Sequence, residues 1–133
     1  AIDQLADFLR PFGYQVHAVL TRGCLHLKSA VTALSDDTVL INPDWVDSDV
    51  FSAYRQIPVA ESEPHAANAV RIASTTSTSS VTAATAASIL MPSNFPETQA
   101  RVQAAGYQVH TVDVSELQKA EGAVTCCSVL FES

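Results

Sequence analysis

The sequence has little basic charge, few cysteines and no long apolar run, and each shortage excludes a class of protein. Seven lysines and arginines against fourteen aspartates and glutamates give a formal net charge of -7, whereas a nucleic-acid-binding surface needs a basic face. No run approaches the roughly 20 apolar residues that span a bilayer. Three cysteines, two of them adjacent, do not form a disulfide framework, and the start has no signal-peptide pattern. We therefore predict a cytoplasmic protein that binds neither nucleic acid nor membrane.

The bulk composition describes one globular domain. Of the 133 residues, 47% are apolar and 16% are charged, which is typical of a folded chain rather than a disordered one. This length supports a single core. The chain begins at Ala1 without a methionine and enters a helical pattern almost at once, so we expect a cut or processed chain.

The most informative feature present is an internal repeat with an offset of 93 residues. Gly13–His17 (GYQVH) recurs without a gap as Gly106–His110, and the register from Gly13 to Thr32 contains nine identities in twenty positions. Each copy reads as a helix, a glycine that ends it, a strand, a loop and a second strand. A repeat of this kind indicates an architecture built from similar units.

Apolar spacing and turn residues predict two helices and eight strands. Apolar residues at i, i+3, i+4 and i+7 predict a helix over 3–12, and a proline and a glycine bound a second helix over 96–105. We expect a hairpin turn at Asp36 and Asp37 and a short helical turn at Val114–Gln118. Enrichment in β-branched residues predicts strands at 14–20, 30–35, 38–42, 56–59, 69–73, 88–91, 107–112 and 124–131.

Residues 74–88 are a low-complexity segment of serine, threonine, alanine and one valine, without charge. We interpret them as an exposed loop insertion between two strands. The alternative is a lid over an active site, and no residue of the segment supports it.

Two residues of the repeat could carry chemistry together. A cysteine attacks as the thiolate, so it needs a base or a positive neighbour. A histidine can protonate a leaving amine and then take a proton from water. His26 lies just before the second strand of one copy, and Cys126 lies just inside the second strand of the other, where Cys127 would point to the opposite face and pack. The alternative is that both residues have ordinary structural places.

Two further groups suggest a metal site, and neither has the full pattern. Asp44, Asp47 and Asp49 are spaced like calcium ligands, but the glycine and the terminal glutamate of an EF-hand loop are missing. Cys24 could bind zinc together with His26 and Cys126, whereas structural zinc sites usually have four regularly spaced ligands. We therefore expect no metal site.

Three segments resemble signature segments of dimethylarginine dimethylaminohydrolases, a family of the guanidino-group-modifying superfamily that also contains arginine deiminases and amidinotransferases. They are Leu25–Ala30 (LHLKSA), Pro64–Asn68 (PHAAN) and Glu121–Leu130 (EGAVTCCSVL). Their order and spacing resemble the C-terminal half of such an enzyme. The resemblance implies an α/β fold, in which residues 1–133 form roughly half of a single catalytic α/β propeller of five ββαβ-type units.

The resemblance also implies roles for single residues. His26 matches the family's general acid/base, and Cys126 matches its nucleophile. Ala120 and Glu121 match positions that line the substrate pocket. Asn68 matches a recurrent asparagine that we interpret as structural.

The implied activity is hydrolysis at the guanidinium carbon of an Nω-methylated arginine, which gives citrulline and a methylamine through a covalent cysteine intermediate, without a cofactor. An arginine deiminase or amidinotransferase with the same chemistry remains an alternative, as does a non-catalytic half-propeller that binds a guanidinium ligand or a partner chain. The aspartates and arginines with which the family binds its substrate lie in its N-terminal half. We therefore expect this chain alone to be inactive, and a missing N-terminal half or a self-association partner to cover its open edges.

Overall fold

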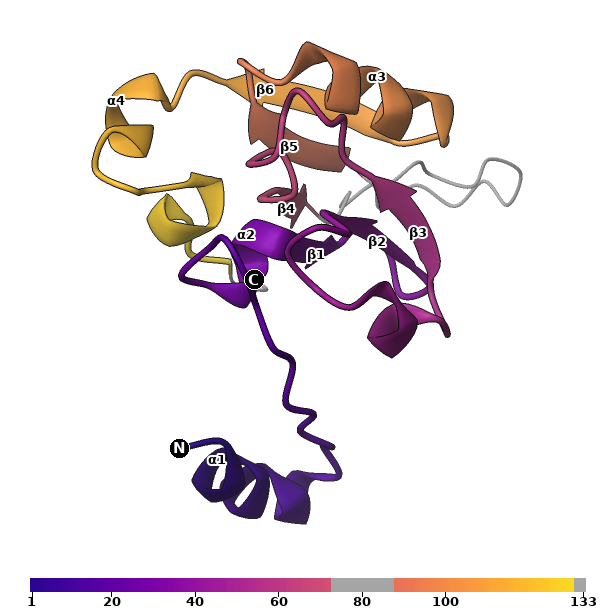
Figure 1. Cartoon of the computed structure of the whole chain (residues 1–133), viewed down its shortest axis with the longest axis vertical. Coiled ribbons are helices and arrows are strands. Elements are labelled where there is room, and N and C mark those ends of the chain that lie inside the picture. Colours follow the sequence, from indigo (N-terminus) through magenta and orange to yellow (C-terminus); the bar gives the residue numbers. More distant parts are fainter. Residues whose placement is uncertain (73–87, 131–133) are drawn as a thin grey trace, which may run out of the picture.

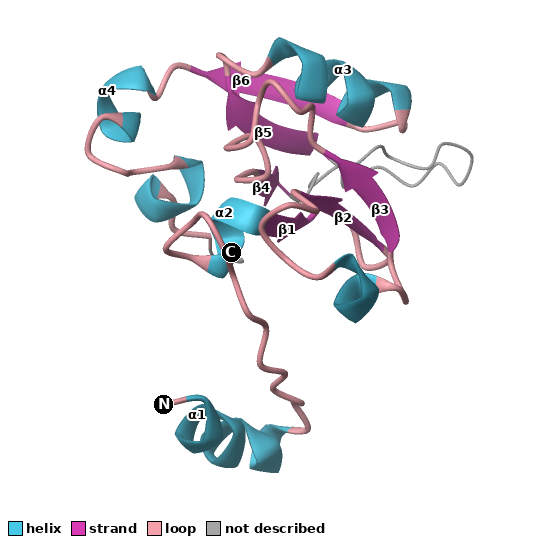
Figure 2. Cartoon of the chain, viewed as in Figure 1, coloured by secondary structure: helices cyan, strands magenta, loops and turns pink. Residues whose placement is uncertain are grey.

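The computed structural model describes residues 1–72 and 88–130 of the chain (Figure 1 and Figure 2). The chain contains both helices and strands. In chain order the elements are α1 (Ile2–Leu9), the 3-10 helix η1 (Arg10–Phe12), α2 (Leu27–Ala30), β1 (Val31–Ala33), β2 (Thr38–Ile41), the 3-10 helix η2 (Ser48–Phe51), β3 (Arg55–Pro58), β4 (Val70–Ile72), β5 (Ser88–Pro92), α3 (Pro96–Ala104), β6 (Gln108–Val112), α4 (Ser115–Gln118) and the 3-10 helix η3 (Val124–Cys127).

The six strands form two sheets with the same topology. In one sheet β1 is antiparallel to β2, and β2 is parallel to β3. In the other sheet β4 is antiparallel to β5, and β5 is parallel to β6. The parallel connection runs through η2 in the first sheet and through α3 in the second, because parallel neighbours need a crossover. Each sheet with its crossover is therefore one ββαβ-type unit, and both predicted helices and six of the eight predicted strands are confirmed.

The predicted turn at Asp36 and Asp37 joins β1 to β2. The Asp37 carboxylate accepts hydrogen bonds from the hydroxyls of Ser35 at 2.6 Å and Thr38 at 2.9 Å. These two bonds lower the pKa of Asp37, because they favour its charged form. The hairpin register that results pairs Val31 with Ile41.

The main core lies between the two units. Leu34, Leu40 and Ile57 from the first unit pack with Ile89, Met91 and Val102 from the second, all of them buried. Val102 belongs to α3, which lies along β6 in Figure 1. Glu63, which is 7% exposed, accepts hydrogen bonds from the backbone of Glu97 at 2.9 Å and Thr98 at 2.7 Å. This carboxylate satisfies two amides at the start of α3 and so fixes the helix to the rest of the core.

The strand predicted at 14–20 does not form. Helix α1 is present as expected, but it buries no residue, and Figure 1 shows α1 away from the sheets at the end of an extended segment. Phe8, Tyr14 and Leu20 are 70%, 66% and 85% exposed. A strand needs a neighbour for its backbone groups, and the single bridge in this stretch joins Thr21 to Val46. The prediction was wrong because no strand among the described residues lies beside 14–20.

The strand predicted at 124–131 is also wrong over its described part. Residues Val124–Cys127 form η3, whose backbone bonds are local, from Cys126 N to Ala123 O at 3.1 Å and from Ser128 N to Thr125 O at 3.4 Å. No strand among the described residues pairs with this segment. The placement of Cys127 on a packed strand face therefore fails as well, since its side chain is exposed.

Two remaining expectations concern the loop and the membrane. The predicted insertion at 74–88 lies outside the described residues, except for Ser88, which begins β5. Over the described ranges, every helix is too short or too polar to cross a membrane.

Candidate functional site

The buried side chain of Asn68 holds together the three segments that were singled out in the sequence. Its amide nitrogen donates to Lys28 O at 3.2 Å and to the Thr125 hydroxyl at 2.9 Å. Its amide oxygen accepts from Thr125 N at 3.1 Å. Asn68 is 3% exposed. One asparagine thus fixes the segment that carries His26 to the segment that carries Cys126, and the prediction that it is structural agrees with these contacts.

His26 occupies the position that precedes α2. Its backbone is extended, with φ -119° and ψ 140°, and its carbonyl accepts from Ser29 N at 2.9 Å. The Cys24 thiol also donates to this carbonyl, at 3.4 Å. Two hydrogen bonds therefore hold the His26 carbonyl, while its imidazole is exposed.

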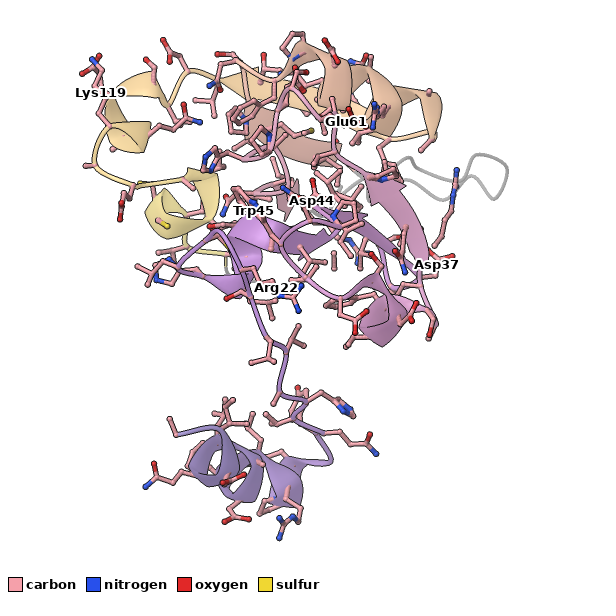
Figure 3. The ribbon with its side chains drawn as sticks, viewed as in Figure 1. Arg22, Asp37, Asp44, Trp45, Glu61 and Lys119 are labelled. Atoms are coloured by element: carbon pink, nitrogen blue, oxygen red, sulfur yellow. The ribbon has the colours of Figure 1, made fainter. Side chains whose placement is uncertain are left out.

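The loop before His26 rests on Trp45. Arg22 N donates to Trp45 O at 2.8 Å, and Thr21 bridges Val46. Gly23 has φ +68°, and a Cβ at this position would come within 2.6 Å of the Trp45 indole. Only glycine fits there without displacing the indole or straining the backbone. Figure 3 labels Arg22 and Trp45 in this part of the molecule.

Glu121 occupies a backbone conformation that usually belongs to glycine. It follows α4 with φ +57°. The chain ends this helix with hydrogen bonds from Glu121 N to Gln118 O at 3.1 Å and from Gly122 N to Leu117 O at 2.8 Å, which is the Schellman pattern. A left-handed residue with a Cβ costs about 1 kcal/mol or more, so this carboxylate is kept at a cost in stability. Such strain is concentrated at functional sites.

His26 and Glu121 line one cavity of about 350 Å³. This volume lies within the range of small-molecule sites. Glu121 is the one acidic residue among the described residues that line it, and these include no lysine or arginine. The lining residues are Gly23, Cys24, Leu25, His26, Ser29, His65, Asn68, Pro92, Asn94, Phe95, Gln118, Glu121, Gly122 and Ala123. The cavity therefore suits a small cation better than an anion.

The other two predicted site residues do not line this cavity. Ala120 precedes Glu121 and is exposed. Cys126 is exposed on η3, three residues after the lining residue Ala123. The half-buried Cys24 lines the cavity instead. Burial raises the pKa of the Cys24 thiol, and a hydrogen bond with Thr21 offsets part of this rise. The raised pKa favours the thiol form of Cys24 over the thiolate, which is the reactive form.

Sequence reasoning missed His65 and Trp45 as parts of the site. The His65 ring packs edge-on against the Trp45 indole, with centroids 4.8 Å apart and planes at 72°, and His65 lines the cavity. The recurrence of a histidine four residues before an alanine-valine pair, at His26 and again at His65, was a signal that could have found it. Trp45 leaves no such mark in the sequence, because its contacts are formed only in the folded chain.

The candidate metal ligands have structural contacts. The Asp47 carboxylate accepts from Asp49 N at 3.1 Å before η2, and Asp44 N donates to the Asn42 side chain at 3.0 Å. Within residues 1–72 and 88–130, no group of three or more His, Cys, Asp or Glu residues could hold a metal ion.

Comparison with known proteins identifies relatives over 96% of the chain. A dimethylarginine dimethylaminohydrolase from Streptomyces coelicolor is 35% identical over 129 residues, which are 96% of this chain and 44% of that protein. One from Pseudomonas aeruginosa is 27% identical over 128 residues, which are 96% of this chain and 45% of that protein. No protein-family model matches. The chain thus spans a little under half the length of these relatives.

Solved structures give the same result for the fold. A variant of the Pseudomonas aeruginosa dimethylarginine dimethylaminohydrolase, complexed with citrulline, superimposes with a TM-score of 0.81 at 26% identity, over 98% of this chain and 46% of that one. An amidinotransferase from Microseira wollei superimposes with a TM-score of 0.73 at 12% identity, over 94% of this chain and 38% of that one, and shows the fold alone. The resemblance to dimethylarginine dimethylaminohydrolases and the α/β fold are both confirmed.

Proposed function

We propose that this chain, a homologue of dimethylarginine dimethylaminohydrolases, supplies the nucleophile and the acid/base of a hydrolase that acts on the guanidinium carbon of an Nω-methylated arginine. Cys126 is the nucleophile and His26 is the general acid/base. The observation that carries this proposal is the hydrogen bonding of Asn68 to Lys28 and Thr125. These two residues lie two positions after His26 and one position before Cys126, so the asparagine supports both reacting groups at once.

The first chemical step forms the covalent intermediate. The Cys126 thiolate attacks the guanidinium carbon and forms a C–S bond. The C–N bond to the methylated nitrogen breaks, and protonated His26 gives its proton to the departing methylamine or dimethylamine. A thiouronium remains on Cys126. This route divides a difficult displacement from a resonance-stabilised cation into two easier steps.

The second step returns the enzyme. Neutral His26 takes a proton from water, and the oxygen attacks the same carbon. The C–S bond then breaks, which restores the Cys126 thiolate and releases citrulline. Each step uses groups of this chain and water, so no metal or cofactor takes part.

The cavity beside His26 would hold the cation. Glu121, which lines the cavity, supplies a carboxylate, and Ala120, the residue before it, supplies a neighbouring backbone carbonyl. The left-handed φ of Glu121 supports this role, because a glycine would end α4 at a lower cost. The presence of Glu121 where glycine is favoured is explained if its carboxylate binds a ligand.

The other groups that bind the substrate would come from a part of the protein outside residues 1–133 or from a second copy of the chain. The offset of 93 residues makes 15–19 the equivalent of β6, and the strand equivalent to β5 would fall before residue 1. We place that strand, the groups that hold the substrate carboxylate, and further groups that contact the guanidinium beside Glu121, in an N-terminal half of a propeller or in a second copy of this chain. Positioning of reactants can account for about 7–11 kcal/mol of a reaction barrier. Because this chain lacks part of the groups that position the substrate, we expect it not to turn over the substrate by itself.

An amidinotransferase or arginine deiminase is the second candidate, because the guanidino-group-modifying superfamily that the signature segments resemble contains both. Both would use Cys126 and His26 in the same first step. They differ from the first candidate in the leaving group or in the acceptor. The N-terminal half or second copy would select between these reactions. A non-catalytic half-propeller would use the same cavity without a reacting thiol.

Thiol labelling tests the assignment of the nucleophile. We expect iodoacetamide to modify Cys126 faster than Cys127 and Cys24 near neutral pH, measured by mass mapping of peptides. The proposal assigns His26 as the acid/base that activates Cys126, whereas burial raises the pKa of Cys24. Cys127 is the matched control, because it is adjacent and equally classed as exposed.

Substitution of His26 tests whether the labelling rate of Cys126 depends on the His26 imidazole. His26→Asn should slow the labelling of Cys126 and leave that of Cys127 unchanged, whereas His110→Asn, at an exposed site outside the cavity, should change neither. Equal rates at Cys126 and Cys127 that do not respond to His26→Asn would refute the catalytic pair.

A further inference from the structure

A second internal repeat relates His65 to His26. His26, Ser29, Ala30 and Val31 stand in the same spacing as His65, Asn68, Ala69 and Val70, with an offset of 39 residues. Val31 begins β1 and Val70 begins β4, so each histidine lies five residues before the first strand of a ββαβ-type unit. The two imidazoles therefore stand at equivalent places of two similar units.

The fold brings these equivalent places to one cavity. His26 and Ser29 line it from the first segment, and His65 and Asn68 line it from the second. The other two histidines of the sequence, His17 and His110, are exposed and are not among the lining residues. The protein thus contains a matched set of two imidazoles inside the site and two outside it.

Most amides of the cavity are already engaged. Asn94 and Gln118 bond one another at 3.0 Å, and Asn68 holds Lys28 and Thr125. For the imidazoles of His26 and His65, and for the Glu121 carboxylate, the described part of the structure gives no side-chain hydrogen bond. These three groups, together with the Ser29 hydroxyl, can therefore meet a ligand.

Trp45 contacts both His65 and the loop that leads to His26. The indole packs against the His65 ring at 4.8 Å and against Gly23 on the loop that leads to His26. Figure 3 labels the indole within the body of the protein. One aromatic side chain thus contacts His65 and also supports the loop that carries His26. A ring held in this way loses little entropy when it binds a ligand.

We infer that His65 is a ligand-binding residue of this site, whose neutral imidazole accepts a hydrogen bond from an N–H of a cationic guanidino group. The guanidino ligand is taken from the proposed function, on which the inference rests to that extent. The two imidazoles then have different tasks. His26 moves the proton, and His65 together with Glu121 fixes the orientation of the planar cation. A neutral imidazole can accept one such bond through its unprotonated nitrogen.

The test follows the four histidines by two-dimensional NMR of the intact chain at about pH 8. Methylguanidinium is the cationic probe, and methylurea is its neutral match. We expect methylguanidinium to shift the ring signals of His26 and His65 and to leave His17 and His110 unshifted. Methylurea should cause smaller shifts at the same concentrations. Trp45 is the one tryptophan of the sequence, so its fluorescence gives a second titration curve.

Variants separate hydrogen bonding from ring packing. His65→Phe keeps a planar ring against Trp45 and removes the acceptor nitrogen, and we expect it to weaken methylguanidinium binding about three- to tenfold, as for one lost hydrogen bond. His65→Gln keeps an amide oxygen and should recover part of the affinity. His110→Phe is the matched control and should bind as the parent chain does.

The outcomes distinguish this inference from the proposed function. If His26 shifts with methylguanidinium while His65 does not, and His65→Phe binds as the parent does, the assignment of His65 is wrong and the Cys126–His26 pair stands. If His65 responds as expected but Cys126 labels no faster than Cys127, the proposed function fails and His65 remains a binding residue. If neither imidazole shifts, the assignment of His65 is wrong.

Discussion

The two copies of the internal repeat, 93 residues apart, share the sequence GYQVH. They differ in how much of the copy packs against the rest of the protein. In the second copy, α3 packs Val102 into the core, and β6 pairs with β5 over five residues. In the first copy, α1 buries no residue, and the segment 14–20 pairs with no strand among the described residues. Both copies end their helix at a left-handed glycine, Gly13 at φ +79° and Gly106 at φ +100°.

The difference separates local from tertiary causes of structure. The helix and its glycine stop appear in both copies, because spacing of apolar residues and a left-handed position act locally. The strand appears in one copy, because a strand requires a neighbour on which to place its amides. The first copy therefore has the local structure of the second, without the neighbouring strand that β5 provides to β6.

Hydrogen exchange should show the largest contrast between the copies. The amides of Val109–Val112 that bond β5 should be protected with the stability of the core, whereas those of Val16–Val19 should exchange as in an open chain. For a core stability of about 5 kcal/mol the rates differ by about a thousandfold or more. The measurement is exchange followed residue by residue by NMR. Comparable protection of both segments would contradict the account.

Truncation of the helix side chains should show the next largest contrast. Val102→Ala removes buried volume from α3, and we expect it to lower the free energy of unfolding by about 2 kcal/mol. Leu9→Ala, at the equivalent place in α1, should change it by less than about 0.5 kcal/mol, because α1 has no packed face. Urea denaturation of both variants measures this. A similar loss in both would mean that α1 packs on the core.

The residue that ends each helix offers a smaller contrast. Gly106→Ala should cost about 1 kcal/mol, since its left-handed φ rather than a contact disfavours a Cβ there. Glu121→Gly, at the end of α4, should raise the free energy of unfolding by about 1 kcal/mol. It should also weaken methylguanidinium binding, because the cavity loses its carboxylate. A Glu121→Gly variant that is less stable than the parent would show that Glu121 is not strained.

The tyrosines of the repeat should give the smallest effect. The Tyr107 hydroxyl shares a hydrogen bond with the Ser35 hydroxyl at 2.9 Å, which joins the two units, whereas Tyr14 is 66% exposed. Tyr107→Phe should lower the free energy of unfolding by about 0.5 to 1 kcal/mol, and Tyr14→Phe should leave it unchanged. Thermal unfolding of the pair checks this, and equal shifts would remove the distinction between the copies.

The parts of the fold that the sequence predicts are those whose partners stand close in the chain. The turn at Asp36 and Asp37 predicts the β1–β2 hairpin, and Gly106 with the residues after it predicts β6, since β5 and α3 precede it within 25 residues. The same sequence after Gly13 led to the wrong prediction of a strand at 14–20, because a local pattern does not indicate whether a neighbouring strand exists. The segment after Val124 misleads for the same reason.

The site is predicted only in part, for a related reason. His26 and Glu121 belong to short signature segments, and both line the cavity. His65 was passed over because its value depends on Trp45, which is 20 residues away and contacts it through a tertiary packing. The strain at Glu121 likewise depends on how α4 ends, and the side chain alone does not indicate a left-handed backbone.

The most direct test of the central claim is an assay of citrulline release from Nω-methylated arginine. It compares the chain alone with a chimera in which the unmatched part of the Streptomyces coelicolor relative is joined to it, each with a Cys126→Ser control. We expect no release by the chain alone above its control. We expect release by the chimera, abolished by Cys126→Ser. Release by the chain alone at the rate of the chimera, or release by the chimera that survives Cys126→Ser, would contradict the account.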